Sequence, residues 1–216
     1  MTSGNDRASP PPESRSRIFG LALLACLSCS GLTAPACAEE TGQNEDTWTI
    51  NALMHNLAQV RNAKATFIER KYLSILKTPL EYSGTLVYRA PGHLEKITLH
   101  PKPESLVLDK DDLVIQNGDV QKKRTLSLHD YPVVWAFVES FRSTLAGDIE
   151  TLNHFYHVSL GGHPKQWQLA LHPLDDGMKK WISEIRIRGS LNQIDSIDIR
   201  ESGGDYSVMT ISKEGP

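Results

Sequence analysis

The segment EYSGTLVYRAPG, residues 81–92, decides the fold class of this chain. Its first nine residues are rich in β-branched and aromatic side chains, a composition that favours a β-strand. Ala90, Pro91 and Gly92 then end the strand, because proline has no backbone N–H to donate and glycine accepts positive φ. Residues 63–70 alternate with a period of two, so the two segments predict neighbouring strands.

The same signals recur along the rest of the chain and predict a mainly β domain with α-helices. The expected antiparallel sheet has about ten strands, joined by short connections rich in Gly, Pro, Asn and Asp. Beyond the first two, strands are predicted at 94–99, 105–108, 113–116, 120–128, 155–160, 166–172, 181–188, 194–201 and 206–212.

Two amphipathic helices interrupt the strand pattern. The first is expected to run from a cap at Thr47 or Asn51 to about Arg61, and the second from Pro132 to Gly147. A further short turn of helix is expected at 148–153. The apolar stripes consist of Leu53, Met54, Leu57 and Val60 in the first helix, and Val133, Val134, Phe137, Val138, Phe141 and Leu145 in the second.

The N-terminus is typical of a signal peptide, predicted to comprise residues 1–38. Arg15 and Arg17 supply the basic region, and residues 18–27 form an apolar run too short to span a bilayer. Ala36-Cys37-Ala38 places small side chains at a cleavage site. Export to the periplasm with cleavage after Ala38 is therefore expected.

Cleavage after Ala38 would leave residues 39–46 as a flexible tail and residues 47–216 as a single domain. An alternative is that residues 23–26, Leu-Leu-Ala-Cys, form a lipobox, and acylated Cys26 would then anchor the protein to a membrane. All 3 cysteines precede Ala38, so a chain cut there has no disulfide and no thiolate metal site.

Composition and motifs argue against nucleic acid binding and against catalysis. The net charge is −3, and no basic stripe with interleaved aromatic residues is present. The chain has no G-x-S-x-G, H-E-x-x-H or P-loop motif. His154 and His157 would share a helix face, but Phe155 and Tyr156 favour a strand, which separates them. We therefore expect no enzyme activity, no cofactor and no metal site.

An antiparallel sheet that curves around two amphipathic helices leaves two possibilities open. The sheet either closes over a packed core or leaves a cavity for an apolar ligand. Periodicity does not distinguish them, because both need apolar side chains on the same face of each strand.

Several strings in the chain resemble the periplasmic outer-membrane lipoprotein carrier family (LolA-like), as a divergent member. The resemblance is clearest in the segment that predicts the second strand, and it covers most of the chain after residue 56. The strings are LAQV (57–60), ATFIER (65–70), SGTLVYRAP (83–91), PESLVL (103–108) and WQL (167–169) followed by Pro173.

The resemblance implies an incomplete, curved antiparallel β-barrel covered by helices that form a lid over an apolar cavity. Members of the family accept the acyl chains of lipoproteins from an inner-membrane donor and pass them to an outer-membrane acceptor. The implied ligands are therefore lipoprotein acyl chains or a related lipid, and a monomer is expected. No nucleotide-binding motif is present, so energy for loading would come from a partner.

The family carries an arginine directly before the proline of a turn and an aromatic residue three positions after it. Here Ala90 precedes Pro91, Arg89 stands one place earlier, and Leu94 takes the aromatic position. Arg89 either latches the lid or, because a shift of one residue reverses facing on a strand, lies on the other face. The remaining ligand-binding candidates are Phe67, Leu86 and Tyr88 in the wall and Val134, Phe137 and Phe141 in the lid.

Two alternatives to a carrier of lipoprotein acyl chains remain. A divergent relative would serve another acylated or apolar cargo. A non-catalytic, outer-membrane-associated interaction module serving lipid biosynthesis or export would have a packed core and no extractable ligand.

Overall fold

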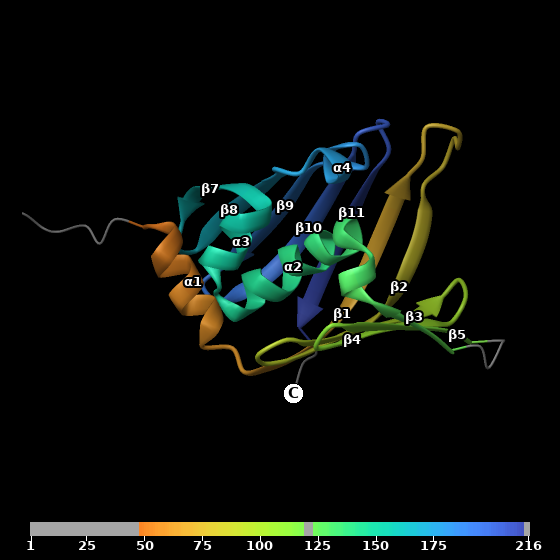
Figure 1. Ribbon diagram of the computed structural model, residues 1–216, viewed down its shortest axis with the longest axis horizontal. Helices are drawn as coiled ribbons and strands as arrows, with labels where there is room; N and C mark the ends of the chain where they lie inside the picture. Colours follow the sequence, from red (N-terminus) through yellow and green to blue (C-terminus); the bar gives the residue numbers. More distant parts are fainter. Residues whose placement is uncertain (1–47, 119–122, 214–216) are drawn as a thin grey trace, which may run out of the picture. The chain divides into compact units, whose positions relative to one another are not determined.

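A computed structural model describes residues 48–118 and 123–213 (Figure 1). Within these residues, eleven strands form one antiparallel sheet. The strands are β1 (Asn62–Tyr72), β2 (Leu80–Arg89), β3 (His93–His100), β4 (Glu104–Asp109), β5 (Asp112–Asn117), β6 (Lys123–Ser127), β7 (Tyr156–His163), β8 (Gln166–Pro173), β9 (Ile182–Ser190), β10 (Gln193–Glu201) and β11 (Tyr206–Lys213). The helices are α1 (Ile50–Ala58), the 3-10 turn η1 (Leu128–Asp130), α2 (Pro132–Ala146), α3 (Ile149–Phe155) and α4 (Asp176–Lys179).

The strand order explains where the helices lie. It runs β6-β5-β4-β3-β2-β1-β11-β10-β9-β8-β7, so strands adjacent in sequence pair except for β6 and β7, and β1 pairs with β11. The two edge strands are therefore β6 and β7, which follow one another in the chain. The connection between them consists of η1, α2 and α3, which must cross from one edge of the sheet to the other.

This crossing places the helices together on one face of the sheet, here called the inner face (Figure 1). The sheet is curved and does not close into a barrel, as the sequence predicts. Gly84 in β2 permits a close approach to β3, since a Cβ at this position would lie 1.9 Å from the carbonyl oxygen of Ile97. A register shift between Ser83 and Gly84 lies at the same place, and such bulges bend a sheet.

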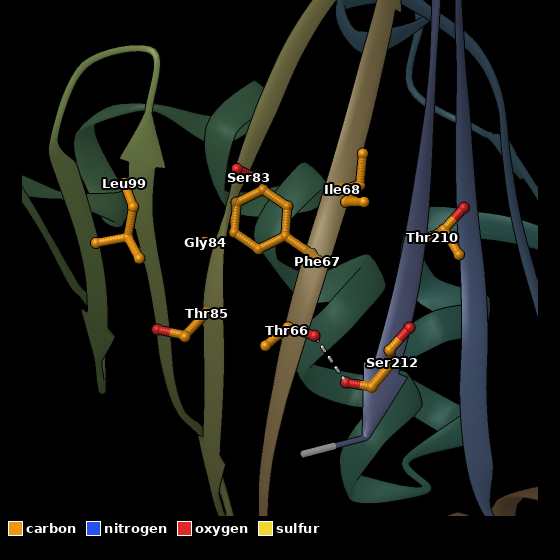
Figure 2. Close-up of a pocket in the computed structure, with 9 residues that line it drawn as sticks. All are labelled: Thr66, Phe67, Ile68, Ser83, Gly84, Thr85, Leu99, Thr210 and Ser212. Atoms are coloured by element: carbon orange, nitrogen blue, oxygen red, sulfur yellow. Dashed lines mark hydrogen bonds between the residues drawn. The ribbon is translucent and has the colours of Figure 1, made fainter. Parts of the chain in front are cut away.

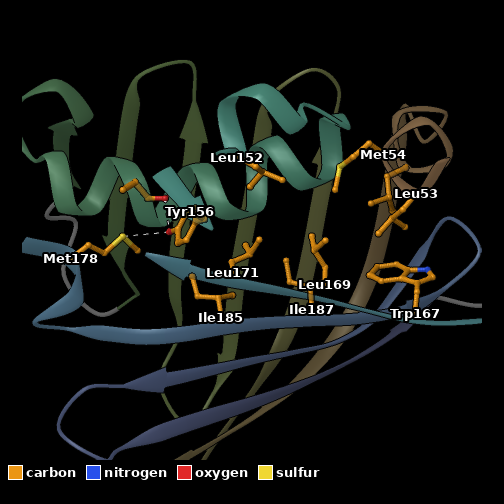
Figure 3. Close-up of a cluster of buried hydrophobic side chains, with 12 residues drawn as sticks. Leu53, Met54, Leu152, Tyr156, Trp167, Leu169, Leu171, Met178, Ile185 and Ile187 are labelled. Carbon is orange, nitrogen blue, oxygen red and sulfur yellow. Dashed lines mark hydrogen bonds between the residues drawn. The ribbon is translucent and has the colours of Figure 1, made fainter. Parts of the chain in front are cut away.

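One part of the inner face carries the main core (Figure 3). Side chains of α1, α3, β8 and β9 interdigitate there, and several have no exposed surface. The hydroxyl of Tyr156 donates a hydrogen bond to the carbonyl oxygen of Ala136 in α2 at 2.8 Å. Burial raises the pKa of Tyr156, so this phenol stays protonated and continues to donate.

The helix ends follow the expected chemistry with two corrections. Helix α1 ends at Ala58, before the predicted limit of about Arg61. Thr49, not Thr47 or Asn51, caps α1, and its Oγ1 accepts from the N–H of Ala52 at 3.2 Å. Thr47 lies outside the described residues, and Asn51 lies one residue inside the helix. The predicted limits of α2 are confirmed, with Pro132 in its first turn and Gly147 in the left-handed conformation at its end.

The most deeply buried face of α2 is not its apolar stripe. The fully buried face consists of Ala136, Glu139, Ser140, Ser143 and Thr144. Short side chains let α2 approach its neighbours closely, and the larger apolar side chains of the stripe are only partly buried.

The predicted signal peptide (1–38), the tail (39–46) and Cys26 lie outside the described residues. No helix within 48–118 and 123–213 is long and apolar enough to cross a bilayer.

Candidate functional site

The inner face divides into two parts. Over β8 and β9, the inner-face side chains are fully buried beneath helices. Over β2 to β6, strand register places a continuous set of apolar side chains on the same face, and these are only partly buried and lie outside the main core. We call this set the inner-face patch; it consists of Leu86, Leu94, Leu106, Leu113, Ile115 and Leu126.

The aromatic wall candidates border this patch and are more deeply buried. Phe67 in β1 is 2% exposed, and Tyr88 in β2 is 4% exposed. Register pairs Tyr88 with Leu94, so the two lie side by side on the inner face. Burial raises the pKa of Tyr88, although the positive charge of Arg61 opposes this shift.

The lid candidates lie on α2. Phe137 and Phe141 form an edge-to-face pair with ring centroids 5.1 Å apart, and both pack against the main core while staying partly exposed. Val134, one turn before Val138, is also partly buried but does not belong to that core. This side of α2 therefore keeps apolar surface that the described contacts do not fully cover.

Arg89 lies on the opposite face of the sheet from Leu86 and Tyr88. Its Nη1 donates to Oε1 of Glu95 at 3.0 Å, and Nε2 of His93 shares a hydrogen bond with the same oxygen at 2.7 Å. The His93 contact lowers the pKa of Glu95, with help from Arg89 and against the effect of burial. The structure thus does not bring Arg89 to the helices, because the one-residue shift relative to Pro91 reverses its facing.

A different arginine ties α2 to the sheet. Nη1 of Arg142 donates to the carbonyl oxygen of Lys110, in the turn between β4 and β5, at 2.7 Å. The stem of Arg142 also packs on Gly92, where an added Cβ would lie 3.0 Å from its Cδ. Helix α2 is therefore held over two turns at one end of the sheet.

Arg142 is itself held by a buried carboxylate. Glu139 is 3% exposed and accepts hydrogen bonds from Nε of Arg142 at 3.2 Å and from Nε1 of Trp135 at 2.9 Å. The hydroxyl of Ser143 donates to Oε2 of Glu139 at 2.8 Å, and Nη2 of Arg142 contacts Oε1 of the same carboxylate. Sequence reasoning missed this network, although the spacing of Glu139 and Arg142 is that of neighbours on a helix.

A second charged group lies on the inner face itself. Nζ of Lys96 donates to Oε2 of Glu69 at 2.5 Å and lies 5.0 Å from the ring centroid of Phe67. Nζ of Lys71 is 3.8 Å from the other oxygen of Glu69. The sequence pattern does not single out Glu69, Lys71 and Lys96 as a group, because Lys96 lies on a different strand.

Two hollows lie away from the inner-face patch. One, of about 340 Å³, is lined mainly by hydroxyl side chains of β1, β2 and β11 such as Thr66, Thr85 and Thr210, together with exposed Ile68 and Leu99 (Figure 2). The other, of about 830 Å³, surrounds the β7–β8 hairpin and is lined by polar groups that include Lys165 and Arg188.

A curved, open antiparallel sheet with helices over its inner face defines the class of carrier-type folds. The chain belongs to the family of outer membrane lipoprotein carrier protein LolA-like proteins, whose model matches residues 43–212. The family expected from the sequence is thus confirmed.

The chain is similar to several solved structures of low sequence identity. A LolA superfamily protein from Nitrosomonas europaea is 12% identical with a TM-score of 0.42, over 78% of this chain and 96% of that one. A putative outer membrane lipoprotein-sorting protein domain from Vibrio parahaemolyticus is 10% identical with a TM-score of 0.42, over 76% and 89%. The Mycobacterium tuberculosis lipoprotein LppX is 10% identical with a TM-score of 0.38, over 77% and 96%. No curated protein matches the chain.

Proposed function

We propose that the protein is a periplasmic, non-catalytic carrier that binds acyl chains of lipoproteins, or a related lipid, on the inner-face patch. The observation that carries this proposal is the set of partly buried apolar side chains between Leu86 and Leu126, which lies beside the helices and outside the packed core. Membership of the LolA-like family supports the same reading.

Transfer of an acyl chain from water to this patch is driven by the hydrophobic effect. Each methylene that leaves water contributes about 0.8 kcal/mol, so a long chain supplies a large driving force. We assign Phe67, Leu86, Tyr88 and Leu94 to the wall of the site. Val134, Phe137 and Phe141 would move with α2 as the lid.

Release then requires a competing site of higher affinity. The sequence has no nucleotide-binding motif, so loading would draw on an inner-membrane donor and unloading on an outer-membrane acceptor. A lid that covers either the cargo or the sheet has two states whose populations a partner can shift. We expect the carrier to act as a monomer after cleavage at Ala38.

The test is mass spectrometry of the full chain, exported in a Gram-negative host and purified without detergent. The intact mass should match a chain that starts at Glu39, and the organic extract should contain stoichiometric lipid. An extract free of lipid, together with no binding of added acyl amphiphiles, would contradict the carrier and favour the interaction module. A mass with acylated Cys26 would instead revise the localisation to a lipid-anchored form.

A further inference from the structure

Charged side chains lie on the inner face at the edge of the patch, where register places Glu104 and Arg124, and also within the patch itself. Register aligns Ile187 and Ile197 of the core region with Met209, and Met209 with Glu69, so Glu69 points to the inner face. Lys71 follows two residues later on the same strand and shares that facing.

Lys96 reaches the same place from β3. It pairs with Leu86 on one side and Leu106 on the other, so it lies on the inner face within the apolar patch. Its ammonium group lies beside both Glu69 and the ring of Phe67. The patch therefore surrounds a cation.

An ion pair in this position needs a reason other than stability. Glu69 is 4% exposed, and an apolar pair of similar volume would commonly stabilise a fold as well as or better than a buried ion pair. The neighbouring positions Leu86, Leu94 and Leu106 are all apolar. A charge kept among them indicates a binding role.

The charges of the three groups do not cancel. Lys71 and Lys96 share the single carboxylate of Glu69, which leaves one net positive charge. The Lys96 side chain retains 26% exposure and that of Lys71 retains 44%, so neither lysine side chain is fully buried. Lysine has three N–H donors, and one of those on Lys96 is used by Glu69.

We propose that Lys96 and Lys71, positioned by Glu69, bind the anionic head group of the cargo, a phosphate or a carboxylate. This inference rests on the proposed carrier function. The acyl chain lies along Leu86, Leu94 and Leu106, directly beside Lys96. The cargo is thereby an anionic amphiphile, and neutral amphiphiles of equal chain length bind more weakly.

The test compares two probes by isothermal titration calorimetry below their critical micelle concentrations. Dodecyl phosphate carries the anionic head, and dodecyl maltoside has the same chain with a neutral head. We expect the full chain to bind dodecyl phosphate at least about tenfold more tightly, the effect of one charge-assisted hydrogen bond. Inorganic phosphate alone should not bind at the same concentrations, because it lacks the acyl chain.

The matched variant is the triple substitution Lys96→Met, Lys71→Met and Glu69→Gln, which removes both cations and leaves no buried carboxylate without a partner. It should keep its affinity for dodecyl maltoside and lose the preference for dodecyl phosphate. Lys179→Met, at a lysine of α4 with 52% side-chain exposure, is the control and should behave as the unaltered protein.

Three results overturn the proposal. One is equal binding of both probes by the unaltered protein, which leaves the carrier function standing. Another is a triple variant that keeps the preference, which makes Glu69, Lys71 and Lys96 a structural link between β1 and β3. The third is tight binding of inorganic phosphate alone. Failure of both probes to bind would instead contradict the carrier function itself.

Discussion

At the scale of single residues, Gly84 sets how closely two strands approach. A side chain at this position would meet the backbone of β3, which cannot rotate away as a flexible side chain would. The shift in register beside it adds curvature at the same point. Gly84, in the segment that predicts β2, thus lies where β2 and β3 approach closely and their register shifts.

The substitution Gly84→Ala should therefore destabilise the fold. The added Cβ would lie 1.9 Å from the Ile97 oxygen, and we expect a loss of about 1–3 kcal/mol in the free energy of unfolding. Urea denaturation provides the measurement. Gly161→Ala is the control, because a Cβ there meets nothing within 4 Å, and its effect should stay within about 0.5 kcal/mol. Equal losses for the two variants would show that the approach of β2 to β3 is not tight.

Asp148 caps α3 and should make stability depend on pH. Its Oδ1 accepts from the N–H of Thr151 at 3.0 Å, and the hydroxyl of Thr151 donates to Oδ2 at 2.6 Å. The side-chain hydrogen bond from Thr151 is the main cause that lowers the pKa of Asp148 below its usual 3.8. The stabilisation is complete above the usual pKa and is lost as pH falls through the lowered folded pKa.

Asp148→Ala should consequently cost about 1 kcal/mol near pH 7 and progressively less in strong acid. Denaturation at a series of pH values measures this difference. Asp148→Asn keeps an acceptor for the Thr151 N–H and should retain most of the stability without the acid dependence. A loss for Asp148→Ala that stays constant down to the lowest pH would contradict the assigned cause.

At the scale of elements, α2 is fixed by polar contacts more than its apolar stripe suggests. Arg142 joins the helix to the carbonyl of Lys110, and Glu139 lies buried behind it. Arg142→Met should leave Glu139 without its cation and free α2 from the β4–β5 turn. The expected loss is about 3 kcal/mol, at the lower end for a buried pair because the Arg142 side chain keeps 21% exposure.

Hydrogen exchange on α2, together with urea denaturation, measures this effect. The pair Arg142→Met with Glu139→Gln should recover part of the loss, since no buried charge is then left unpaired. Arg70→Met is the control, because its ion pair with Glu81 is more than half exposed on both sides. If the α2 amides of Arg142→Met were as well protected from hydrogen exchange as those of the unaltered protein, Arg142 would not be the residue that holds α2 on the sheet.

The sequence was sufficient to predict most elements but not their contacts. Alternation in residues 63–70 predicts β1, the composition of residues 81–89 predicts β2, and Pro132 and Gly147 predict the limits of α2, because all of these depend on local chemistry. The sequence does not determine which face of the sheet Arg89 lies on, since a shift of one residue decides it. The Arg142 and Lys96 contacts join residues far apart in sequence, and no local pattern reports them.

At the scale of the whole molecule, function follows from how the chain crosses its own sheet. Because β6 and β7 are the two edges and are consecutive strands, the helices between them must span the inner face. They pack firmly over β8 and β9 and leave the inner-face patch partly open. The account's central claim is that this open part is where the cargo binds.

The most direct measurement uses two adjacent residues of β2 that face opposite sides of the sheet. Leu86 lies in the inner-face patch, and Val87 lies on the outer face. Binding of the neutral fluorescent probe N-phenyl-1-naphthylamine is titrated for Leu86→Gln and Val87→Gln, with matched urea midpoints as the check on folding. The account predicts about tenfold weaker binding for Leu86→Gln and no change for Val87→Gln. Equal affinities for the two variants, or a loss only for Val87→Gln, would contradict it.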